Sequence, residues 1–218
     1  MKALKSSADS GPEFPGVVLA GGRSSRMGRN KALLPFGPES LVLRATRRLT
    51  PQVTAVAINA NDRPPELEAL GFSVFSDLDD SRAGPLGGIL ASLRYAGVAS
   101  WSSSHVVTVA IDSPFFPTDL VARLAGAIDR PDRIAVAASS GGLHPVFGLW
   151  PLALADDLEH WLSSGRSLRL RDWLARHGAT EVHFADHETG LGRLDPFFNV
   201  NTPADLVAAQ HWLGALDR

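Results

Sequence analysis

The chain has 218 residues, of which 44% are hydrophobic and 20% charged, so it is long enough to bury the core of one sizeable α/β domain. Its formal net charge of -2 gives no electrostatic reason to expect a nucleic-acid partner. It contains no cysteine, which excludes disulfides, a thiol nucleophile and thiolate metal ligands.

The N-terminal residues and the lengths of the apolar runs bear on location. Residues 1–15 predict a flexible leader without the apolar centre of a signal peptide, and residues 11–14 are typical of a sequence left by cloning. The apolar runs have the length of strands and are too short to span a bilayer. We therefore expect a cytoplasmic protein without membrane contacts, in which residues 16–218 form one domain.

Short apolar runs alternate with segments of helical periodicity from Gly16 onward. In chain order the pattern predicts strands or helices over residues 16–20, 41–49, 53–58, 72–75, 86–95, 106–111, 120–128, 134–138, 144–150, 152–162, 168–177 and 181–185. Pro117 is expected in the first turn of the helix over 120–128, and Thr202 and Pro203 are expected to begin a C-terminal helix. This alternation predicts a single-domain α/β fold, a Rossmann-like, doubly wound and mostly parallel sheet with helices on both faces.

Polar residues follow the predicted strands at the points where they end. Gly21, Asn59, Asp77 and Asp112 each come directly or almost directly after a strand. Because the carboxyl ends of parallel strands meet at one edge of an open α/β sheet, we expect these residues to line one ligand crevice.

The segment from Leu19 to Lys31 has the composition of a phosphate-binding loop. Gly21 and Gly22 follow the first strand, where backbone N–H groups can approach an anion closely. Arg26 and Lys31 would supply positive charge, and Lys31 is the only lysine outside the leader. The loop has neither the Walker pattern nor the dinucleotide-binding Gly-x-Gly-x-x-Gly. A surface loop that is merely rich in glycine and arginine is the alternative.

Asp112 is the first candidate for a metal ligand, because it follows the most apolar strand. Magnesium takes few protein carboxylates and leaves its other positions to water and phosphate, so a single aspartate suits it. The alternative is an ordinary turn residue at the end of a strand.

The run from Leu19 to Lys31 resembles the signature of the molybdenum cofactor guanylyltransferases, and more loosely that of the wider sugar-nucleotide and cytidylyl transferases. The resemblance extends over the chain after the leader. Its further matches, in order, are Asn59-Ala60-Asn61, Gly84-Pro85-Leu86-Gly87-Gly88, Asp112-Ser113-Pro114-Phe115, His144-Pro145 and Asn199-Val200-Asn201-Thr202-Pro203.

This resemblance implies an enzyme that transfers GMP from GTP to the terminal phosphate of molybdopterin and releases pyrophosphate. It implies Mg²⁺ as the cofactor, with Mn²⁺ as the alternative. GTP and molybdopterin are the expected partners, together with transient contacts with molybdoenzyme chaperones.

The resemblance also assigns roles to residues. The nucleotide side comprises Leu19, Ala20, Gly21, Gly22, Lys31, Asn59, Asp77 and Asp112. The catalytic group comprises Arg26, Lys31 and Asp112. Asp112 is the metal ligand, with Asn201 as a second candidate, and the acceptor side comprises Asn199, Asn201 and His144.

Several alternatives stay open from the sequence. The closest are a transferase that uses CTP and one that loads a sugar phosphate; a nucleotide-binding protein without turnover is the rival from another class. Arg166, Arg169 and Arg171 either meet the acidic acceptor or form the solvated face of a helix. We expect no zinc site, because the histidines lack ligand spacing.

Overall fold

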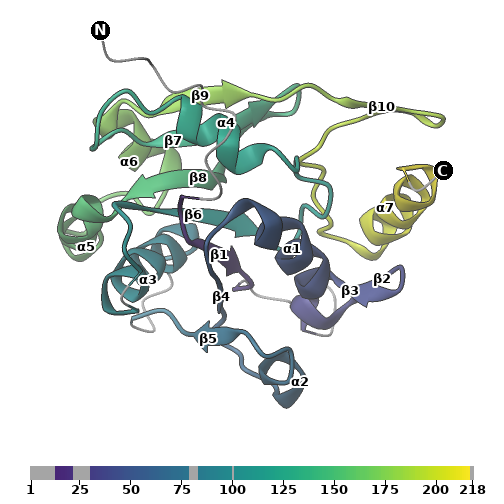
Figure 1. The fold of residues 1–218 in the computed structure, drawn as a ribbon, viewed down its shortest axis with the longest axis horizontal. Helices are drawn as coiled ribbons and strands as arrows, with labels where there is room; N and C mark the ends of the chain where they lie inside the picture. Colours follow the sequence, from purple (N-terminus) through teal and green to yellow (C-terminus); the bar gives the residue numbers. More distant parts are fainter. Residues whose placement is uncertain (1–12, 22–29, 79–82, 100, 217–218) are drawn as a thin grey trace, which may run out of the picture.

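The computed structural model describes residues 13–21, 30–78, 83–99 and 101–216. Its centre is a seven-stranded sheet in the order β5-β4-β1-β6-β8-β7-β9, which runs from the bottom to the top of Figure 1. The strands are β1 (Gly16–Leu19), β4 (Val56–Asn59), β5 (Ser73–Phe75), β6 (His105–Ala110), β7 (Ala135–Ser139), β8 (Gly142–Pro151) and β9 (Thr180–His183). β8 is antiparallel to β6 and β7, and the other pairs of this sheet are parallel. The predicted mostly parallel sheet is confirmed.

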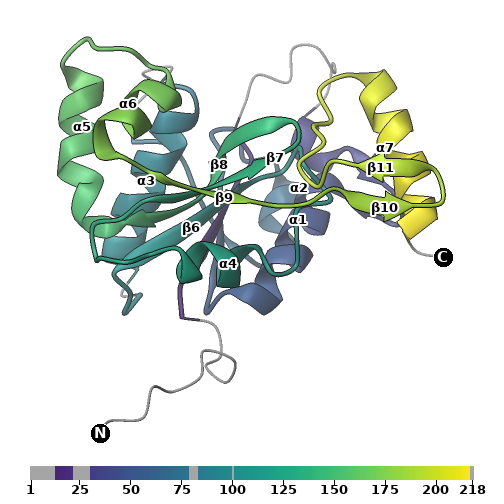
Figure 2. The ribbon, with the colours of Figure 1, turned by 90° about the horizontal axis from the view of Figure 1, so that it is seen from above.

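Helices cover both faces of the sheet, which confirms the predicted doubly wound α/β fold (Figure 2). α3 (Pro85–Val98), α5 (Ala155–Ser163) and α6 (Leu170–His177) pack on one face. α1 (Leu41–Leu49), α2 (Pro65–Glu68) and α4 (Leu120–Gly126) pack on the other. Short 3-10 helices span Lys31–Leu33, Thr50–Gln52 and Leu152–Leu154. None of the helices in the described ranges combines the length and the apolar character needed to cross a membrane.

The strands have two buried faces, and this is why they read as unbroken apolar runs in the sequence. In β1, Val17 packs into the cluster under α3, α5 and α6, whereas the next residue, Val18, packs into the cluster under α1 and α4. Both side chains are fully buried. Burial of a valine contributes about 1.5–3 kcal/mol relative to exposure, so alternate residues of one strand stabilise both layers.

A third apolar cluster lies at one end of the sheet, around α7 (Pro203–Leu216). It includes residues of the small hairpins β2 (Pro35–Phe36)–β3 (Glu39–Ser40) and β10 (His187–Thr189)–β11 (Gly192–Leu194). Thr202 caps α7 as predicted, since its hydroxyl accepts from the Asp205 N–H at 3.1 Å. The Asp205 carboxylate in turn accepts from the backbone N–H groups of Asn201 and Thr202.

The predicted elements are mostly found, with differences that have local causes. α1 begins and ends at the predicted residues, and the Ser40 hydroxyl caps it by accepting from the Leu43 N–H. The expectation that Pro117 lies in the first turn of α4 was wrong: α4 begins at Leu120 with Asp119 as its N-cap. The hairpins β2–β3 and β10–β11 were not predicted, because two- and three-residue strands leave too little alternation to detect.

The N-terminal boundary of the sheet lies near the predicted end of the leader. The Phe14 carbonyl accepts from the Thr54 N–H, and the Pro15 carbonyl accepts from the Val107 N–H, both at 2.9 Å. Residues 1–12 lie outside the described residues, so the flexible leader stays a prediction.

A buried hydroxyl joins β6 to β8. Thr108 is fully buried and donates to the Val146 carbonyl at 2.6 Å, while it accepts from Nε1 of the fully buried Trp150 at 2.8 Å. One side chain thus satisfies the buried Trp150 N–H and the carbonyl of the half-buried Val146.

We expect Thr108→Val to lower the free energy of unfolding by about 1–3 kcal/mol, because it leaves the buried Trp150 N–H without its acceptor. The double variant Thr108→Val/Trp150→Phe should be less destabilised than the sum of its parts. Urea unfolding of both variants and of the surface control Thr50→Val measures this. A Thr108→Val variant as stable as Thr50→Val would contradict the prediction.

Candidate functional site

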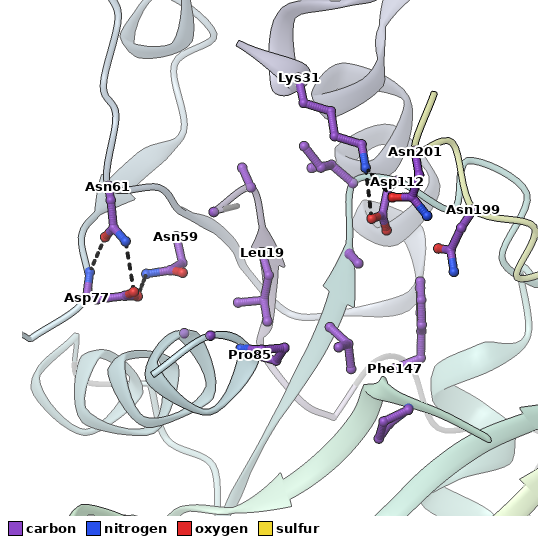
Figure 3. Close-up of a pocket in the computed structure, with 18 of the residues that line it drawn as sticks. Leu19, Lys31, Asn59, Asn61, Asp77, Pro85, Asp112, Phe147, Asn199 and Asn201 are labelled. Carbon is purple, nitrogen blue, oxygen red and sulfur yellow. Dashed lines mark hydrogen bonds and ion pairs between the residues drawn. The ribbon is translucent and has the colours of Figure 1, made fainter. Parts of the chain in front are cut away.

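A cavity of about 970 Å³ opens at the edge of the sheet where β1, β4, β5 and β6 end. Its floor comes from the ends of β1 and β6, its walls from α3 and from residues of β8, and its far side from the segment that precedes α7. Figure 3 shows that two polar clusters lie at opposite ends of this cavity, one around Asp77 and one around Asp112. The polar residues after the strands therefore meet in one crevice, as predicted.

The cluster around Asp112 combines a positive group, the Lys31 ammonium, with a negative one, the Asp112 carboxylate. Nζ of Lys31 lies 3.0 Å from Oδ2 of Asp112 and 3.0 Å from Oδ1 of Asn201 (Figure 3). Lys31 begins a 3-10 helix that Asn30 caps, because Oδ1 of Asn30 accepts from the Ala32 N–H at 3.0 Å. The Lys31 and Asp112 side chains are 18% and 28% exposed, so the pair is shielded from water but open to a ligand.

The loop after Asp112 is held from two sides. The Asp112 carbonyl accepts from the Val200 N–H at 2.7 Å, and the buried Ser113 hydroxyl donates to Oδ1 of Asn199 at 2.8 Å. On the other side, Arg44 donates to the carbonyl of Pro114, while Arg48 donates to those of Phe115 and Phe116. Residues four apart on a helix share a face, so α1 presents both guanidinium groups to this loop.

Burial affects the charge of one of these arginines. Desolvation, with a smaller contribution from neighbouring Arg44, lowers the pKa of Arg48 to about 10. The guanidinium still carries its charge at neutral pH. Its hydrogen bonds to backbone carbonyls therefore involve a charged donor, which strengthens them.

The second cluster fixes the carboxylate of Asp77. Nδ2 of Asn59 donates to Oδ1 of Asp77 at 3.0 Å, and Nδ2 of Asn61 donates to Oδ2 at 2.8 Å (Figure 3). The Asp77 N–H donates to Oδ1 of Asn61 at 2.8 Å. Because a carboxylate only accepts and a backbone N–H only donates, both asparagine amides have a defined orientation. Asn61 holds Asp77 at two points.

The N-terminal turn of α3 approaches this cluster closely. Gly84, at φ +58°, precedes α3, and Pro85 is its first residue. A Cβ on Gly88 would lie 2.9 Å from Oδ1 of Asn59, and a Cβ on Gly87 would lie 3.4 Å from Oδ2 of Asp77. Gly88 is therefore required for close packing against Asn59, whereas the distance at Gly87 is that of an ordinary contact. The first N–H groups of a helix also favour an anion, and here they border the cavity.

On the remaining side of the cavity lies a compact polar network. The Ser139 hydroxyl lies 2.7 Å from Nε2 of His144 and 2.8 Å from Oδ2 of Asp195. The His144 ring stacks on Phe197 with 4.4 Å between ring centroids. Burial lowers the pKa of His144; the Asp195 carboxylate opposes this shift, and Arg171 adds to it.

The structure brings the described members of the predicted site together. The following predicted residues line the cavity: Leu19, Ala20, Gly21, Lys31, Asn59, Asp77, Asp112, His144, Asn199 and Asn201. Gly22 and Arg26 lie outside the described residues.

Of the three arginines considered for the acceptor, two have defined contacts. Arg166 lies over the ring of Trp161, 5.1 Å from its centroid. Arg171 donates to the carbonyl of Leu143, which lines the cavity. All three arginines are exposed.

Several residues that hold the predicted site residues in place were not predicted from the sequence. Asn61 was part of a quoted motif, yet its two-point contact with Asp77 depends on the pairing of β4 with β5. Asn30 donates to Asp62 at 2.9 Å, and both line the cavity. No local signal marked Asp195, whose partner Ser139 is 56 residues away.

The cluster around Asp112 has the chemistry of a site for a hard cation. Oδ2 of Asp112 and Oδ1 of Asn201 both lie 3.0 Å from one positive group, the Lys31 ammonium, so they already converge on one point. Carboxylate and amide oxygens suit Mg²⁺ or Mn²⁺, which take their other ligands from water and phosphate. Within the described ranges no three His, Asp or Glu side chains form a metal-binding group.

Comparison with known proteins identifies relatives over most of the chain. Residues 16–182 match the MobA-like NTP transferase domain. A molybdenum cofactor guanylyltransferase of Rhizobium johnstonii is 54% identical over 201 residues, which cover 92% of this chain and 93% of that protein. The enzyme of the same name from Cereibacter sphaeroides is 41% identical over 199 residues, which cover 91% of this chain and 96% of that protein.

Solved structures share the fold. Molybdopterin-guanine dinucleotide biosynthesis protein A from Archaeoglobus fulgidus superposes with a TM-score of 0.68 at 22% identity, over 92% of this chain and 99% of that one. CMP:2-keto-3-deoxy-manno-octonic acid synthetase, in complex with CTP, superposes with a TM-score of 0.66 at 16% identity, over 93% and 98%.

The pKa of His144 leads to a testable dependence of stability on pH. Because burial lowers this pKa from 6.5, the unfolded chain binds more protons at this position than the folded chain does at mildly acidic pH. The free energy of unfolding should therefore fall as the pH is lowered below about 6.5. The pKa of buried His105 is lowered as well and adds to this trend.

Replacement of His144 by Gln should reduce the slope of stability against pH, as measured by urea unfolding between about pH 5 and pH 7.5. The exposed His160→Gln variant is the control and should keep the wild-type slope. Equal slopes in all three proteins would contradict a lowered pKa at His144.

Proposed function

Because the chain belongs to the molybdenum cofactor guanylyltransferases, we propose that it transfers GMP from GTP to the terminal phosphate of molybdopterin and releases pyrophosphate. The observation that carries the proposal for this structure is a cavity that has a polar cluster at each end (Figure 3). The Asp77 cluster offers hydrogen-bond acceptors to a nucleoside. The Asp112 cluster has the charged groups that would meet phosphates and a metal ion.

The Asp77 cluster is the proposed nucleoside side. Asn59 and Asn61 use their amide groups to hold the Asp77 carboxylate in place. A carboxylate oxygen has more than one lone pair, so Asp77 can still accept from ribose hydroxyls or from the N–H groups of a base. Leu19 and Ala20 line the cavity beside this cluster and supply apolar contacts.

The triphosphate would extend from this cluster towards Lys31. The Gly21 backbone and the first turn of α3 border the path, and the Lys31 ammonium lies at its end. These groups would offset negative charge on the triphosphate and on the departing pyrophosphate. Gly22 and Arg26 belong to the proposal through the family resemblance alone.

Asp112 and Asn201 are the proposed ligands of Mg²⁺, with Mn²⁺ as the alternative. When bound, the ion would supply positive charge to the phosphate oxygens. Without it, the Lys31 ammonium keeps the two oxygens together and balances the charge of Asp112.

In the proposed reaction, a terminal phosphate oxygen of molybdopterin forms a bond to the α-phosphorus of GTP in line with the leaving group. The bond from that phosphorus to the bridging oxygen of the β-phosphate breaks, and pyrophosphate leaves with the bonding electrons. The attacking phosphate is already anionic at neutral pH, so no base is required. His144 therefore belongs to the acceptor side and has no role in proton transfer.

The acceptor would enter beside Asn199, Asn201 and His144, which line the end of the cavity next to Asp112. A cytoplasmic location is part of the proposal. Transient contacts with molybdoenzyme chaperones, and the absence of nucleic-acid or membrane partners, are further parts of the proposal.

Calorimetry with GTP, ATP, CTP and UTP in the presence of Mg²⁺ tests the nucleotide. A preference for GTP, followed by pyrophosphate release on addition of molybdopterin, would support the proposal. A preference for CTP would favour the cytidylyltransferase alternative. Binding of a nucleotide without release of pyrophosphate, in the presence of molybdopterin or of a sugar phosphate, would favour a non-catalytic nucleotide-binding protein.

We expect Asp112→Asn to lower kcat by about a hundredfold to a thousandfold, because it removes the carboxylate proposed to hold the metal ion opposite the developing charge. Asp119→Asn is the matched control, since Asp119 is exposed and makes no side-chain cap bond. Steady-state pyrophosphate release measures both. An Asp112→Asn variant with the activity of the Asp119→Asn control would contradict the metal role.

We expect Gly88→Ala to weaken GTP binding by about tenfold or more, because the new methyl would displace the Asn59 side chain from Asp77. Helix α3 itself should not be destabilised, since alanine in a helix is favoured over glycine by about 0.5–1 kcal/mol. Gly97→Ala in the same helix is the control, because a Cβ there would meet nothing within 4 Å. Calorimetry and thermal unfolding separate the two effects; equal GTP affinity in both variants would refute the prediction.

A further inference from the structure

The segment from Asp195 to Asn201 carries two proposed acceptor-side residues but belongs to no helix or strand. Figure 3 shows Asn199 and Asn201 close to Asp112 at the same end of the cavity. Without a ladder of backbone hydrogen bonds, a small number of individual side-chain and backbone contacts must fix the course of this segment.

Asp195 makes the first of these contacts. Its Oδ1 accepts from the Phe197 N–H at 2.8 Å, and its backbone carbonyl accepts from the Phe198 N–H at 3.0 Å. Its Oδ2 accepts from the Ser139 hydroxyl at 2.8 Å. One residue thus forms a turn in its own segment and ties that turn to the hairpin of β7 and β8.

The proton positions at Ser139 follow from the types of its partners. The Asp195 carboxylate only accepts, so the single hydroxyl hydrogen of Ser139 points to it. The Gly141 N–H, at 3.1 Å, and Nε2 of His144, at 2.7 Å, must then donate to the hydroxyl oxygen. The neutral His144 ring therefore carries its hydrogen on Nε2, and Ser139 is fully satisfied. A fully satisfied buried network is rigid.

The turn also sets the position of the Phe197 ring. This ring is 1% exposed and stacks on His144, and it contacts Phe147 and Phe184 at centroid distances of 4.9 Å and 5.6 Å. The same hairpin that binds the Asp195 carboxylate thus encloses the ring two residues later. The segment cannot rotate at this point.

The other end of the segment is fixed to the loop after β6. The Val200 N–H donates to the Asp112 carbonyl at 2.7 Å, and the Ser113 hydroxyl donates to Oδ1 of Asn199 at 2.8 Å. Asn201, the next residue, reaches the Lys31 ammonium. The contacts of Asp195 with the hairpin therefore hold the beginning of the segment 195–201. The end of this segment contacts Asp112 and Lys31.

Gly141 supports a specific role for this contact. A Cβ on Gly141 would lie 2.3 Å from Oδ2 of Asp195, so a side chain at that position would exclude the carboxylate from the turn. The hairpin is shaped to admit Asp195.

We propose that Asp195 is a positioning residue, which acts through Ser139 and Phe197 to hold Asn199 and Asn201 on the acceptor side of the cavity. This inference rests on the proposed function. Asp195 does not contact the nucleoside cluster around Asp77, so its loss should weaken acceptor binding more than nucleotide binding.

The test compares Asp195→Ala with Asp195→Asn. Alanine removes both side-chain contacts, and we expect the KM for molybdopterin to rise by about tenfold or more. The dissociation constant of Mg²⁺–GTP should rise by a clearly smaller factor, because only Asn201 of the displaced pair faces the proposed metal ion. Asparagine can still accept from the Phe197 N–H through its Oδ1. Its amide can donate to Ser139, whose hydrogen then turns to Nε2 of the other His144 tautomer. We expect it to restore most of the KM.

Ser140→Ala is the matched control. The exposed Ser140 hydroxyl ties the turn between β7 and β8 to Asp186 at 2.6 Å. Asp186 lies outside the segment that carries the asparagines. It should leave the KM for molybdopterin unchanged. If thermal unfolding shows that Asp195→Ala does not fold, Ser139→Ala is the second variant. It removes the hydroxyl that links Asp195, His144 and Gly141 but leaves the contact of Asp195 with the Phe197 N–H, so it should raise the KM by a smaller factor.

Hydrogen exchange, followed by mass spectrometry without any ligand, tests the positioning separately from turnover. Asp195→Ala should speed exchange over the peptide that contains Phe197 and Val200, and Ser140→Ala should not. Equal losses of nucleotide and acceptor binding, or unchanged exchange in a folded Asp195→Ala variant, would overturn the inference. If wild-type protein shows no molybdopterin-dependent turnover but the exchange pattern is as expected, the proposed function fails and the positional role of Asp195 stands.

Discussion

The Lys31 ammonium bridges Oδ2 of Asp112 and Oδ1 of Asn201, each at 3.0 Å, and so joins parts of the chain that are up to 170 residues apart. Lys31 follows β1, Asp112 follows β6, and Asn201 precedes α7. A carboxylate in a partly shielded cavity needs a positive neighbour or a metal ion. The rest of the cavity is arranged around this requirement, because each of the three residues has its own backbone support.

Those supports differ in kind. Lys31 depends on a capped 3-10 helix, Asp112 on its place after a buried central strand and on the guanidinium groups of α1, and Asn201 on a segment tied to Asp112 and to the β7–β8 hairpin. The parallel sheet supplies the common frame, since neighbouring parallel strands deliver their carboxyl ends to one edge. The antiparallel strand β8 adds the wall that carries His144 and Phe147.

At the other end of the cavity, neutral amides take the place of a cation. Asn59 and Asn61 hold the Asp77 carboxylate, and Gly88 allows α3 to come close to Asn59. One end thus holds a carboxylate fixed by neutral amides, and the other holds a carboxylate paired with a lysine. In the proposed function, the first end would accept hydrogen bonds from a nucleoside and the second would meet the charges of its triphosphate.

The sequence by itself determined the α/β class, the mostly parallel sheet and the meeting of Gly21, Asn59, Asp77 and Asp112 in one crevice. The family resemblance supplied most of the other predicted residues that line the cavity. Buried parallel strands leave apolar runs, and residues at their ends share an edge, so both signals are local. Only the tertiary structure decided the clamp of Asn61 on Asp77, the approach of Asp195 to Ser139 and the direction of β8. Each of these depends on which strands or segments become neighbours. Local sequence patterns do not specify the distance between residues that lie far apart along the chain.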